Sequence, residues 1–414
     1  MDRTDKCRSC FGTGLVEVLS LGCLPLANAL LTTEQLAEPE ETYPLNLVFC
    51  PHCTLVQITE TVPPEKLFRD YVYLSSFSDT ILRHAQELAG RMAVSQRLDA
   101  ASLVVEVASN DGYLLQYYKQ AGIPVLGIEP AVNIARIAEE QHGIPTLCEF
   151  FGEKLAMQLR QQGRAADVIH AHNVLAHVPD LNGVVHGFER LLKKSGIVVV
   201  EVPYVIDMID RCEFDTIYHE HLCYFSLTAL EQLFRRNGLV IYDVERLAIH
   251  GGTLRIYARA ETQQDGADEQ GAAVRSLLES EVSWHAQSAS FYRKFRDQVG
   301  AVRETLLELL RELKRKQKRI AAYGASAKGS TLLTSLGINK DTIDFVVDRS
   351  AVKQGLYTPG AHLPIYAPGK LVEGMPDYVL LLTWNFAAEI LEQQAAYRRR
   401  GGRFIIPIPE VQIV

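Results

Sequence analysis

The chain lacks any hydrophobic run long enough to cross a membrane, and it lacks an excess of positive charge. The apolar segment 196–206 is interrupted by Glu201 and Pro203, and no apolar N-terminal segment precedes a cleavage site. Lys and Arg number 42 against 50 for Asp and Glu, a net charge of -8, which disfavours general binding to nucleic acid phosphates. We therefore expect a cytoplasmic protein that binds neither membrane nor nucleic acid.

The cysteines are too few for a disulfide-rich protein, with eight in 414 residues, but four of them form two pairs. Cys7 and Cys10 form one Cys-x-x-Cys turn, and Cys50 and Cys53 form another. Two such turns can place four sulfurs around one tetrahedral zinc ion. Because four thiolates leave no open position for a substrate, we predict a structural zinc site. Redox-active pairs, or a chance arrangement, are the alternatives.

The segment 103–112 predicts a buried strand and a tight turn, but it lacks the G-x-G-x-x-G fingerprint of dinucleotide-binding folds. Its acidic turn disfavours a pyrophosphate and suits the cationic, phosphate-free end of S-adenosylmethionine. A second strand, 125–129, ends in Glu129, which we expect to accept the ribose hydroxyls. The alternative is an ordinary βαβ unit whose acids are solvated.

Strands and helices continue to alternate, with strands expected at 167–170 and 197–202 and helices at 79–97 and after Asp180. Alternation predicts a parallel sheet with helices on both faces, and ligands bind beyond the carboxyl ends of such strands. The residues that we expect to bind the cofactor at this edge are Glu106, Asn110, Asp111, Glu129, His172 and Asn173.

The last third predicts a continuous helical region over 276–319, then a second α/β unit that opens with the small-residue turn 324–329. Backbone N–H groups of such a turn can approach an anion, and Lys328 can add a positive charge. A tight structural turn explains the same residues equally well. Further strands are expected at 343–347, 378–382 and 404–406.

Four consecutive proton-handling side chains, 218–221, follow the strand at 197–202. His221 can act as a general base near neutral pH, Glu220 can orient it or hold charge, and Tyr218 can donate to a developing oxyanion. A structural hydrogen-bond cluster is the main alternative, and a metal site at His219 and His221 lacks an evident third ligand. We predict that Tyr218, Glu220 and His221 are catalytic.

The order of these motifs resembles that of the three-domain sugar C-methyltransferases, which act on nucleotide-linked 4-keto-6-deoxy sugars. The resemblance covers essentially the whole chain. The departures are Ala108, where a glycine is usual, Ser326, where a proline is common, the basic run 170–172, where less basic residues are usual, and Cys223 inside the matching segment 218–226. Besides the two Cys-x-x-Cys turns, the matching segments are 71–75, 106–112, 173–174, 218–226, 250–255 and 324–329.

The resemblance implies that S-adenosylmethionine binds the middle domain and that the nucleotide sugar lies between the middle and C-terminal domains. It also implies that His221 removes the proton beside the ketone, assisted by Tyr218 and Glu220. The residues that we assign to substrate binding are Tyr73, Tyr224, Ser326 and Lys328. The expected fold is α/β, with an N-terminal zinc-binding module (1–75), a central Rossmann-like methyltransferase domain (76–258) and a C-terminal Rossmann-like α/β domain (259–414).

Three other classes of protein stay open on the sequence. An NAD-dependent oxidoreductase would use the turn 324–329 with Asp348, although the glycine spacing fits that fingerprint poorly. An O- or N-methyltransferase would keep the middle domain with less need of the base cluster. A zinc-ribbon interaction protein would need to have lost ligand binding, against the intact Glu106, Asp111 and Glu129.

Overall fold

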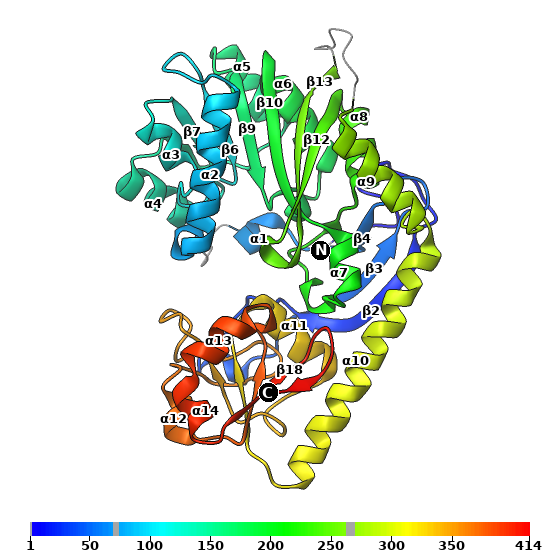
Figure 1. Cartoon of the computed structure of the whole chain (residues 1–414), viewed down its shortest axis with the longest axis vertical. Helices are drawn as coiled ribbons and strands as arrows, with labels where there is room; N and C mark the ends of the chain where they lie inside the picture. The colour runs from blue at the N-terminus through cyan, green and yellow to red at the C-terminus, as the bar shows by residue number, and fades with distance from the viewer. Residues whose placement is uncertain (1, 69–73, 262–269) are drawn as a thin grey trace.

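The computed structural model describes residues 2–68, 74–261 and 270–414, and these form three main sheets joined by helices (Figure 1). The N-terminal sheet is antiparallel, with strand order β11-β4-β3-β2. Its edge strand β11 (Cys223–Tyr224) follows closely after the run 218–221 that is expected to be catalytic. The other elements of this module are β1 (Asp2–Arg3), β2 (Val16–Pro25), β3 (Thr42–Phe49), β4 (Val56–Ile58), β5 (Glu60–Thr61), η1 (Gln35–Ala37) and α1 (Pro64–Phe68).

The central sheet has the strand order β12-β13-β10-β9-β6-β7-β8, and its strands from β10 to β8 run parallel. The order reverses between β9 and β6, which is where doubly wound sheets bind their ligands. Its strands are β6 (Val104–Val107), β7 (Val125–Ile128), β8 (Thr146–Leu147), β9 (Ala166–His172), β10 (Leu192–Pro203), β12 (Leu239–Leu247) and β13 (Thr253–Ala260).

Helices cover both faces of this sheet, as the alternating pattern predicted (Figure 1). The helix expected after Asp180 is present, and the Asp180 carboxylate caps it by accepting from the Gly183 N–H at 2.9 Å. The helices are α2 (Asp79–Ser95), α3 (Leu115–Gln120), α4 (Val132–His142), α5 (Glu153–Gln161), α6 (Leu181–Leu191), α7 (Val205–Asp210) and α8 (Leu227–Arg236), with short turns η2 (Ser75–Phe77), η3 (Leu175–His177), η4 (Phe214–Thr216) and η5 (Ile249–Gly251).

The prediction of one continuous helix over 276–319 was wrong. The region forms α9 (Ala272–Ser283) and α10 (Ala289–Arg315) with a break between them. His285 takes a positive φ of 61° there, and the Ser288 hydroxyl caps α10 by accepting from the Ser290 N–H at 3.1 Å. The apolar periodicity persists across the break, because both helices bury one face in the core.

The C-terminal sheet has the order β16-β15-β14-β17-β18-β19, parallel except for β19, so this region is also a doubly wound α/β unit. The turn at Gly324 follows its central strand. The elements are β14 (Ile320–Tyr323), α11 (Ala327–Leu336), β15 (Val346–Val347), β16 (Ile365–Tyr366), α12 (Lys370–Gly374), β17 (Tyr378–Leu381), η7 (Trp384–Phe386), α13 (Ala387–Gln393), α14 (Ala395–Arg399), β18 (Arg403–Ile406) and β19 (Gln412–Ile413).

The three regions share one apolar core. Phe49 of β3 stacks on Tyr292 of α10 at 4.8 Å between ring centroids, and both belong to a buried cluster that also contains Phe214 and Leu332. The long helix α10 runs from the central region to the C-terminal one and packs against β2 (Figure 1). Within the described part of the chain, no helix has both the length and the apolar character needed to cross a membrane.

Candidate functional site

The four paired cysteines converge in the N-terminal module. The Cys7 and Cys53 sulfurs lie 3.4 Å apart, those of Cys10 and Cys50 lie 3.6 Å apart, and all four sulfurs lie within 4.8 Å of one another. Tetrahedral zinc–thiolate sites have bonds of about 2.3 Å, which puts neighbouring sulfurs roughly 3.8 Å apart. The geometry therefore fits one zinc ion held by four sulfurs.

The first cysteine turn is docked onto the central region. The Asn182 side-chain amide of α6 donates to the carbonyl oxygens of Arg8 and Ser9 at 3.1 and 2.9 Å. Arg236 of α8 also donates to the Ser9 carbonyl at 3.0 Å. A metal that holds this turn together thus also preserves the contact between the zinc module and two helices of the central region.

The turn after β6 has an unusual backbone. Ala108, Asn110 and Gly112 take positive φ angles of 52°, 49° and 80°. A side chain at Gly112 would start 2.7 Å from Ile144, so glycine is required there by space as well as by conformation. The Glu129 carboxylate stabilises the turn from β7, because it accepts from the Asn110 N–H at 2.9 Å and from the Ala131 N–H at 2.9 Å.

The acids of this turn suit a ligand that donates hydrogen bonds. Asn110 Oδ1 accepts from the Ser75 N–H at 2.9 Å, and Asp111 Oδ2 accepts from the Ser76 N–H at 3.3 Å. The second Asp111 oxygen is buried without a hydrogen-bond partner among the described residues. Burial raises the pKa of Glu129 and raises that of Glu106 well above its ordinary value. This set of acceptor oxygens fits the ammonium group of the methionine part of S-adenosylmethionine, which donates hydrogen bonds.

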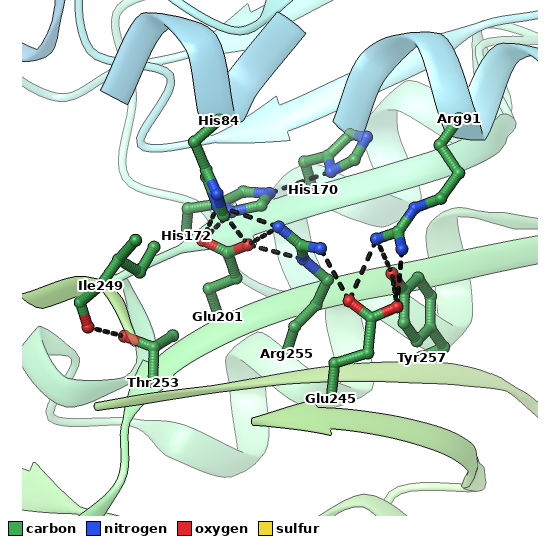
Figure 2. A network of polar contacts seen from close by, with 10 residues as sticks. All are labelled: His84, Arg91, His170, His172, Glu201, Glu245, Ile249, Thr253, Arg255 and Tyr257. Carbon is green, nitrogen blue, oxygen red and sulfur yellow. Dashed lines mark hydrogen bonds and ion pairs between the residues drawn. The ribbon is translucent and has the colours of Figure 1, made fainter. Parts of the chain in front are cut away.

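His172 faces a buried charged network rather than an empty space (Figure 2). Its Nδ1 lies 3.0 Å from Glu201 Oε2, and its Nε2 lies 3.0 Å from Nδ1 of His170. His170 in turn pairs with the Tyr118 hydroxyl at 2.8 Å. Burial lowers the pKa of His170 well below its ordinary value, so this ring is neutral. Next in the chain, Asn173 takes a positive φ of 56° and donates its N–H to the Glu201 carbonyl at 2.8 Å.

The same network reaches α2 and the antiparallel edge of the sheet (Figure 2). Arg255 donates to Glu201 at 2.6 Å and to Glu245 at 2.8 Å, and Glu245 also pairs with Arg91 of α2 at 2.7 Å. Burial opposes ionisation of Glu201, yet the charges and hydrogen bonds of His172, His84 and Arg255 hold its pKa well below the ordinary value.

Tyr218 and His221 form a hydrogen-bonded pair. The Tyr218 hydroxyl lies 2.9 Å from His221 Nε2, and His221 Nδ1 lies 2.9 Å from the carbonyl oxygen of Thr216. A carbonyl only accepts, so Nδ1 carries the proton and Nε2 accepts from the tyrosine. Burial, and the neighbouring His177, lower the pKa of His221 well below its ordinary value. The ring is neutral, with its basic nitrogen directed at Tyr218.

Glu220 and His219 point toward the N-terminal module instead. Glu220 Oε1 accepts from the Asn28 side-chain amide at 2.7 Å, and burial raises the pKa of Glu220 to about 7. His219 Nε2 lies 3.2 Å from each of the carbonyl oxygens of Tyr43 and Pro44. The described histidines at 219 and 221 belong to no cluster of metal-binding side chains.

The C-terminal region contributes a cation beside two acids. Lys328 Nζ lies 3.3 Å from Glu213 and 5.3 Å from the Trp384 ring centroid, and Trp384 donates to Asp215 at 2.7 Å. Burial raises the pKa of Glu213 to about 7, although Lys328 opposes this shift. One oxygen of Asp215 is buried without a hydrogen-bond partner in the described chain. Ser326 caps α11 by accepting from the Gly329 N–H at 3.1 Å.

Of the remaining residues assigned to the substrate, Tyr224 is buried, with its hydroxyl 3.4 Å from the Thr216 carbonyl. Tyr73 lies outside the described residues. The sequence reasoning missed His177, whose ring centroid lies 4.8 Å from that of His221. Burial lowers the pKa of His177 to about 4, and its Nδ1 has no hydrogen-bond partner among the described residues. His177 belongs to no sequence motif, so the sequence did not mark it as a site residue. Only the fold brings it close to His221.

The central sheet thus reverses its strand order beside an acidic turn at the carboxyl end of β6, and a four-cysteine site lies in the N-terminal module. Three family descriptions match: a zinc binding domain over residues 7–68, a methyltransferase domain over 81–244 and a C-methyltransferase C-terminal domain over 248–409. The C-methyltransferase NovU of Streptomyces niveus is 36% identical over 410 residues, which cover 99% of this chain and 97% of that protein.

This chain therefore belongs to the three-domain C-methyltransferase family, whose cofactors are S-adenosylmethionine and zinc. Two solved methyltransferases each resemble less than half of this chain. An S-adenosylmethionine-dependent methyltransferase from Clostridium acetobutylicum is 11% identical, with a TM-score of 0.35, over 43% of this chain and 92% of that one. The CcbJ methyltransferase from Streptomyces caelestis is 13% identical, with a TM-score of 0.34, over 42% of this chain and 89% of that one.

Proposed function

We propose that this C-methyltransferase methylates the carbon beside the ketone, at C-3, of a nucleotide-linked 4-keto-6-deoxy sugar. The observation that carries the proposal is the orientation of His221, whose Nδ1–H is held by the Thr216 carbonyl 2.9 Å away while Nε2 accepts from Tyr218. A neutral imidazole with a fixed tautomer is ready to accept a proton. Methyl transfer to oxygen or nitrogen has less need of such a base, since lone pairs are already present there.

The proposed chemistry begins with removal of the proton from the carbon beside the ketone, which leaves the electron pair as an enolate. His221 Nε2 accepts the proton by one of two routes. In the direct route, Tyr218 gives up its hydrogen bond to Nε2 and the proton passes from carbon to the imidazole. In the relay route, the Tyr218 hydroxyl takes the proton from carbon as it passes its own proton to Nε2. A hydroxyl donor beside the ketone oxygen then stabilises the developing negative charge, and Tyr218 is our candidate for that role. When bound, S-adenosylmethionine supplies an electrophilic methyl group for the resulting carbon nucleophile.

The cofactor contacts that we propose lie at the edge of the central sheet. The Glu129 carboxylate accepts from two backbone N–H groups and keeps further acceptor capacity for ribose hydroxyls. The unpaired oxygen of Asp111 is our candidate acceptor for the methionine ammonium. Within this set, His172 acts by contacting Glu201, which positions the end of β9. The full proposed set is Glu106, Asn110, Asp111, Glu129, His172 and Asn173.

The substrate contacts that we propose lie toward the C-terminal region. Lys328 is the charge best suited to a nucleotide phosphate, and the unpaired oxygen of Asp215 can accept from a sugar hydroxyl. The start of α11, capped by Ser326, adds backbone N–H groups near the same lysine. Tyr73 and Tyr224 complete the proposed set.

A mass-spectrometric screen of nucleotide-linked sugars with S-adenosylmethionine tests the proposal. We expect a gain of one methyl group with a 4-keto-6-deoxy sugar and none with its 4-hydroxy counterpart, because only the ketone can hold the charge of the deprotonated carbon. Carbon–proton correlation spectra of the product identify the methylated atom. A methyl group on oxygen or nitrogen, or equal turnover of the 4-hydroxy sugar, would overturn the proposal.

A further inference from the structure

A turn of the zinc module, residues 26–31, lies between the catalytic segment (residues 218–226) and the C-terminal region. At one end, Leu31 and Tyr357 exchange two backbone hydrogen bonds, of 2.9 and 2.8 Å, as an isolated antiparallel bridge. Close by, the Glu40 carboxylate accepts from the Gly360 N–H at 2.9 Å. The preceding strand β2, blue in Figure 1, packs against α10 and α11. The turn is therefore held by the C-terminal region.

At its other end this turn reaches Glu220. The Asn28 side-chain amide donates to Glu220 Oε1 at 2.7 Å, a contact between residues 192 positions apart. Glu220 is only 5% exposed, whereas Asn28 is exposed to solvent. The carboxyl group of Glu220 is thus buried, and it accepts a hydrogen bond from the side-chain amide of an exposed residue, Asn28.

The zinc module also holds the rest of the catalytic segment. His219 contacts the carbonyl oxygens of Tyr43 and Pro44 at 3.2 Å, and the Ile58 N–H donates to the Leu222 carbonyl at 3.0 Å. The pairing of β11 with β4 continues this attachment. These contacts involve the backbone and the side chain of His219, which is not one of the proposed catalytic residues. Asn28 differs from them because it contacts the side chain of a proposed catalytic residue, Glu220.

We propose that Asn28 is a positioning residue for methyl transfer, which orients the Glu220 carboxyl group and favours its ionised form. The inference rests on the proposed function in that it assigns Glu220 a part in the reaction. It gives the zinc module a role in the active site beyond its own folding: the module supplies one hydrogen-bond donor to the catalytic segment.

The groups around Glu220 make this contact testable by pH. His219 and His221 flank Glu220 in the chain, His177 of η3 lies against its backbone, and Lys328 of α11 acts on His221. Burial raises the pKa of Glu220 to about 7, and the hydrogen bond from Asn28 is the side-chain contact that opposes this shift. Removing the donor must therefore raise the pKa of Glu220 further.

The first measurement needs no substrate. The pKa of Glu220 is followed by carbon NMR of the protein labelled at glutamate carboxyl carbons, with its signal identified by its loss in Glu220→Gln. We expect Asn28→Ala to raise this pKa. The matched control is Asn46→Ala in the same module, since the Asn46 side chain accepts from the Ser20 hydroxyl at 2.7 Å, a contact between β2 and β3. An unchanged pKa in Asn28→Ala, with its zinc content intact, would overturn the inference.

The second measurement is the pH dependence of kcat. In Asn28→Ala the limb of the pH profile that reports Glu220 should move to higher pH. We expect kcat near pH 7 to fall about 2- to 10-fold, the range for loss of one hydrogen bond of ordinary net strength. In a Glu220→Gln background the same substitution should have no further effect. An unchanged profile, or additive losses, would overturn the positioning role. If another class of substrate is methylated instead, the proposed function fails and the same comparison is made with that substrate.

Discussion

His84 Nε2 lies 2.8 Å from Glu201 Oε1, and this contact joins α2 to the middle of the central sheet (Figure 2). The residues just before α2 also contact the acidic turn after β6, since the Ser75 and Ser76 N–H groups donate to the side chains of Asn110 and Asp111. The position of α2 and the geometry of the acidic turn are consequently linked through one short segment.

The first prediction concerns Glu201. Glu201→Gln leaves the buried guanidinium of Arg255 with less compensation, and breaking a buried ion pair costs about 3–5 kcal/mol. We expect the free energy of unfolding to fall by roughly that amount. Glu245→Gln is the control, because its side chain is 29% exposed against 3% for Glu201. Equal midpoints for the two variants in urea denaturation would contradict this account.

The second prediction concerns zinc. Freshly purified protein should contain one zinc ion per chain, and Cys50→Ser should release it and loosen the contacts of Arg8 and Ser9 with α6. Metal analysis and thermal unfolding measure both effects. Cys23→Ser changes an exposed cysteine outside the cluster and should alter neither. Absence of zinc from the wild-type protein would disprove the assignment.

The third prediction concerns the cofactor. Glu129→Ala should weaken S-adenosylmethionine binding by on the order of 1.5–3 kcal/mol, the range for a hydrogen bond to a charged group. Glu129 also accepts from the Asn110 N–H, so Glu129→Ala disturbs the turn as well as the cofactor contact. Glu129→Gln keeps one carbonyl acceptor for that N–H and therefore tests the cofactor contact more specifically. Calorimetric titration gives the affinities. Glu140→Ala, at an exposed position on α4, should bind normally, and normal binding by Glu129→Ala would remove Glu129 from the site.

The fourth prediction separates His221 from Tyr218. His221→Asn should lower kcat by about 10²–10⁴-fold while both ligands still bind, and it should abolish exchange of the sugar's α-proton with deuterated solvent if the wild type shows such exchange. Tyr218→Phe removes the hydroxyl but leaves the imidazole base. If Tyr218 only stabilises the oxyanion, its variant keeps measurable exchange, whereas a proton relay through its hydroxyl predicts that exchange is lost. Methyl transfer near the wild-type rate in His221→Asn would move the base to another residue.

The fifth prediction is a pH dependence of stability. Burial raises the pKa of Glu220 to about 7 from an ordinary value of 4.5, so between these pH values the folded chain binds more protons than the unfolded chain. Stability contributed by this group is present below the unfolded pKa and is lost as the pH rises toward 7. Glu220→Gln should therefore gain stability relative to wild type between pH 5 and pH 8, by on the order of 3 kcal/mol. Parallel pH profiles in chemical denaturation would contradict the shift.

Much of the fold was predictable from local patterns. The α/β alternation, the strand at Val104–Val107, the strand at Val125–Ile128 and the helix capped by Asp180 all follow from short apolar runs and capping residues. The break between α9 and α10 was not predicted, because apolar spacing continues through it and the positive φ at His285 carries no strong sequence signal. The domain boundaries and the individual site roles stay predictions.

The sequence by itself determined the zinc ligands, because paired Cys-x-x-Cys turns bring two sulfurs together through local backbone geometry. It also determined the acidic turn after β6 and the run of residues that contains Tyr218 and His221. Only the tertiary structure decided which side chains meet. Within four consecutive residues, Tyr218 and His221 pair with each other while His219 and Glu220 turn to the zinc module. The partners Asn28 and His177 come from distant segments, and such contacts depend on the packing of whole sheets and helices rather than on spacing along the chain.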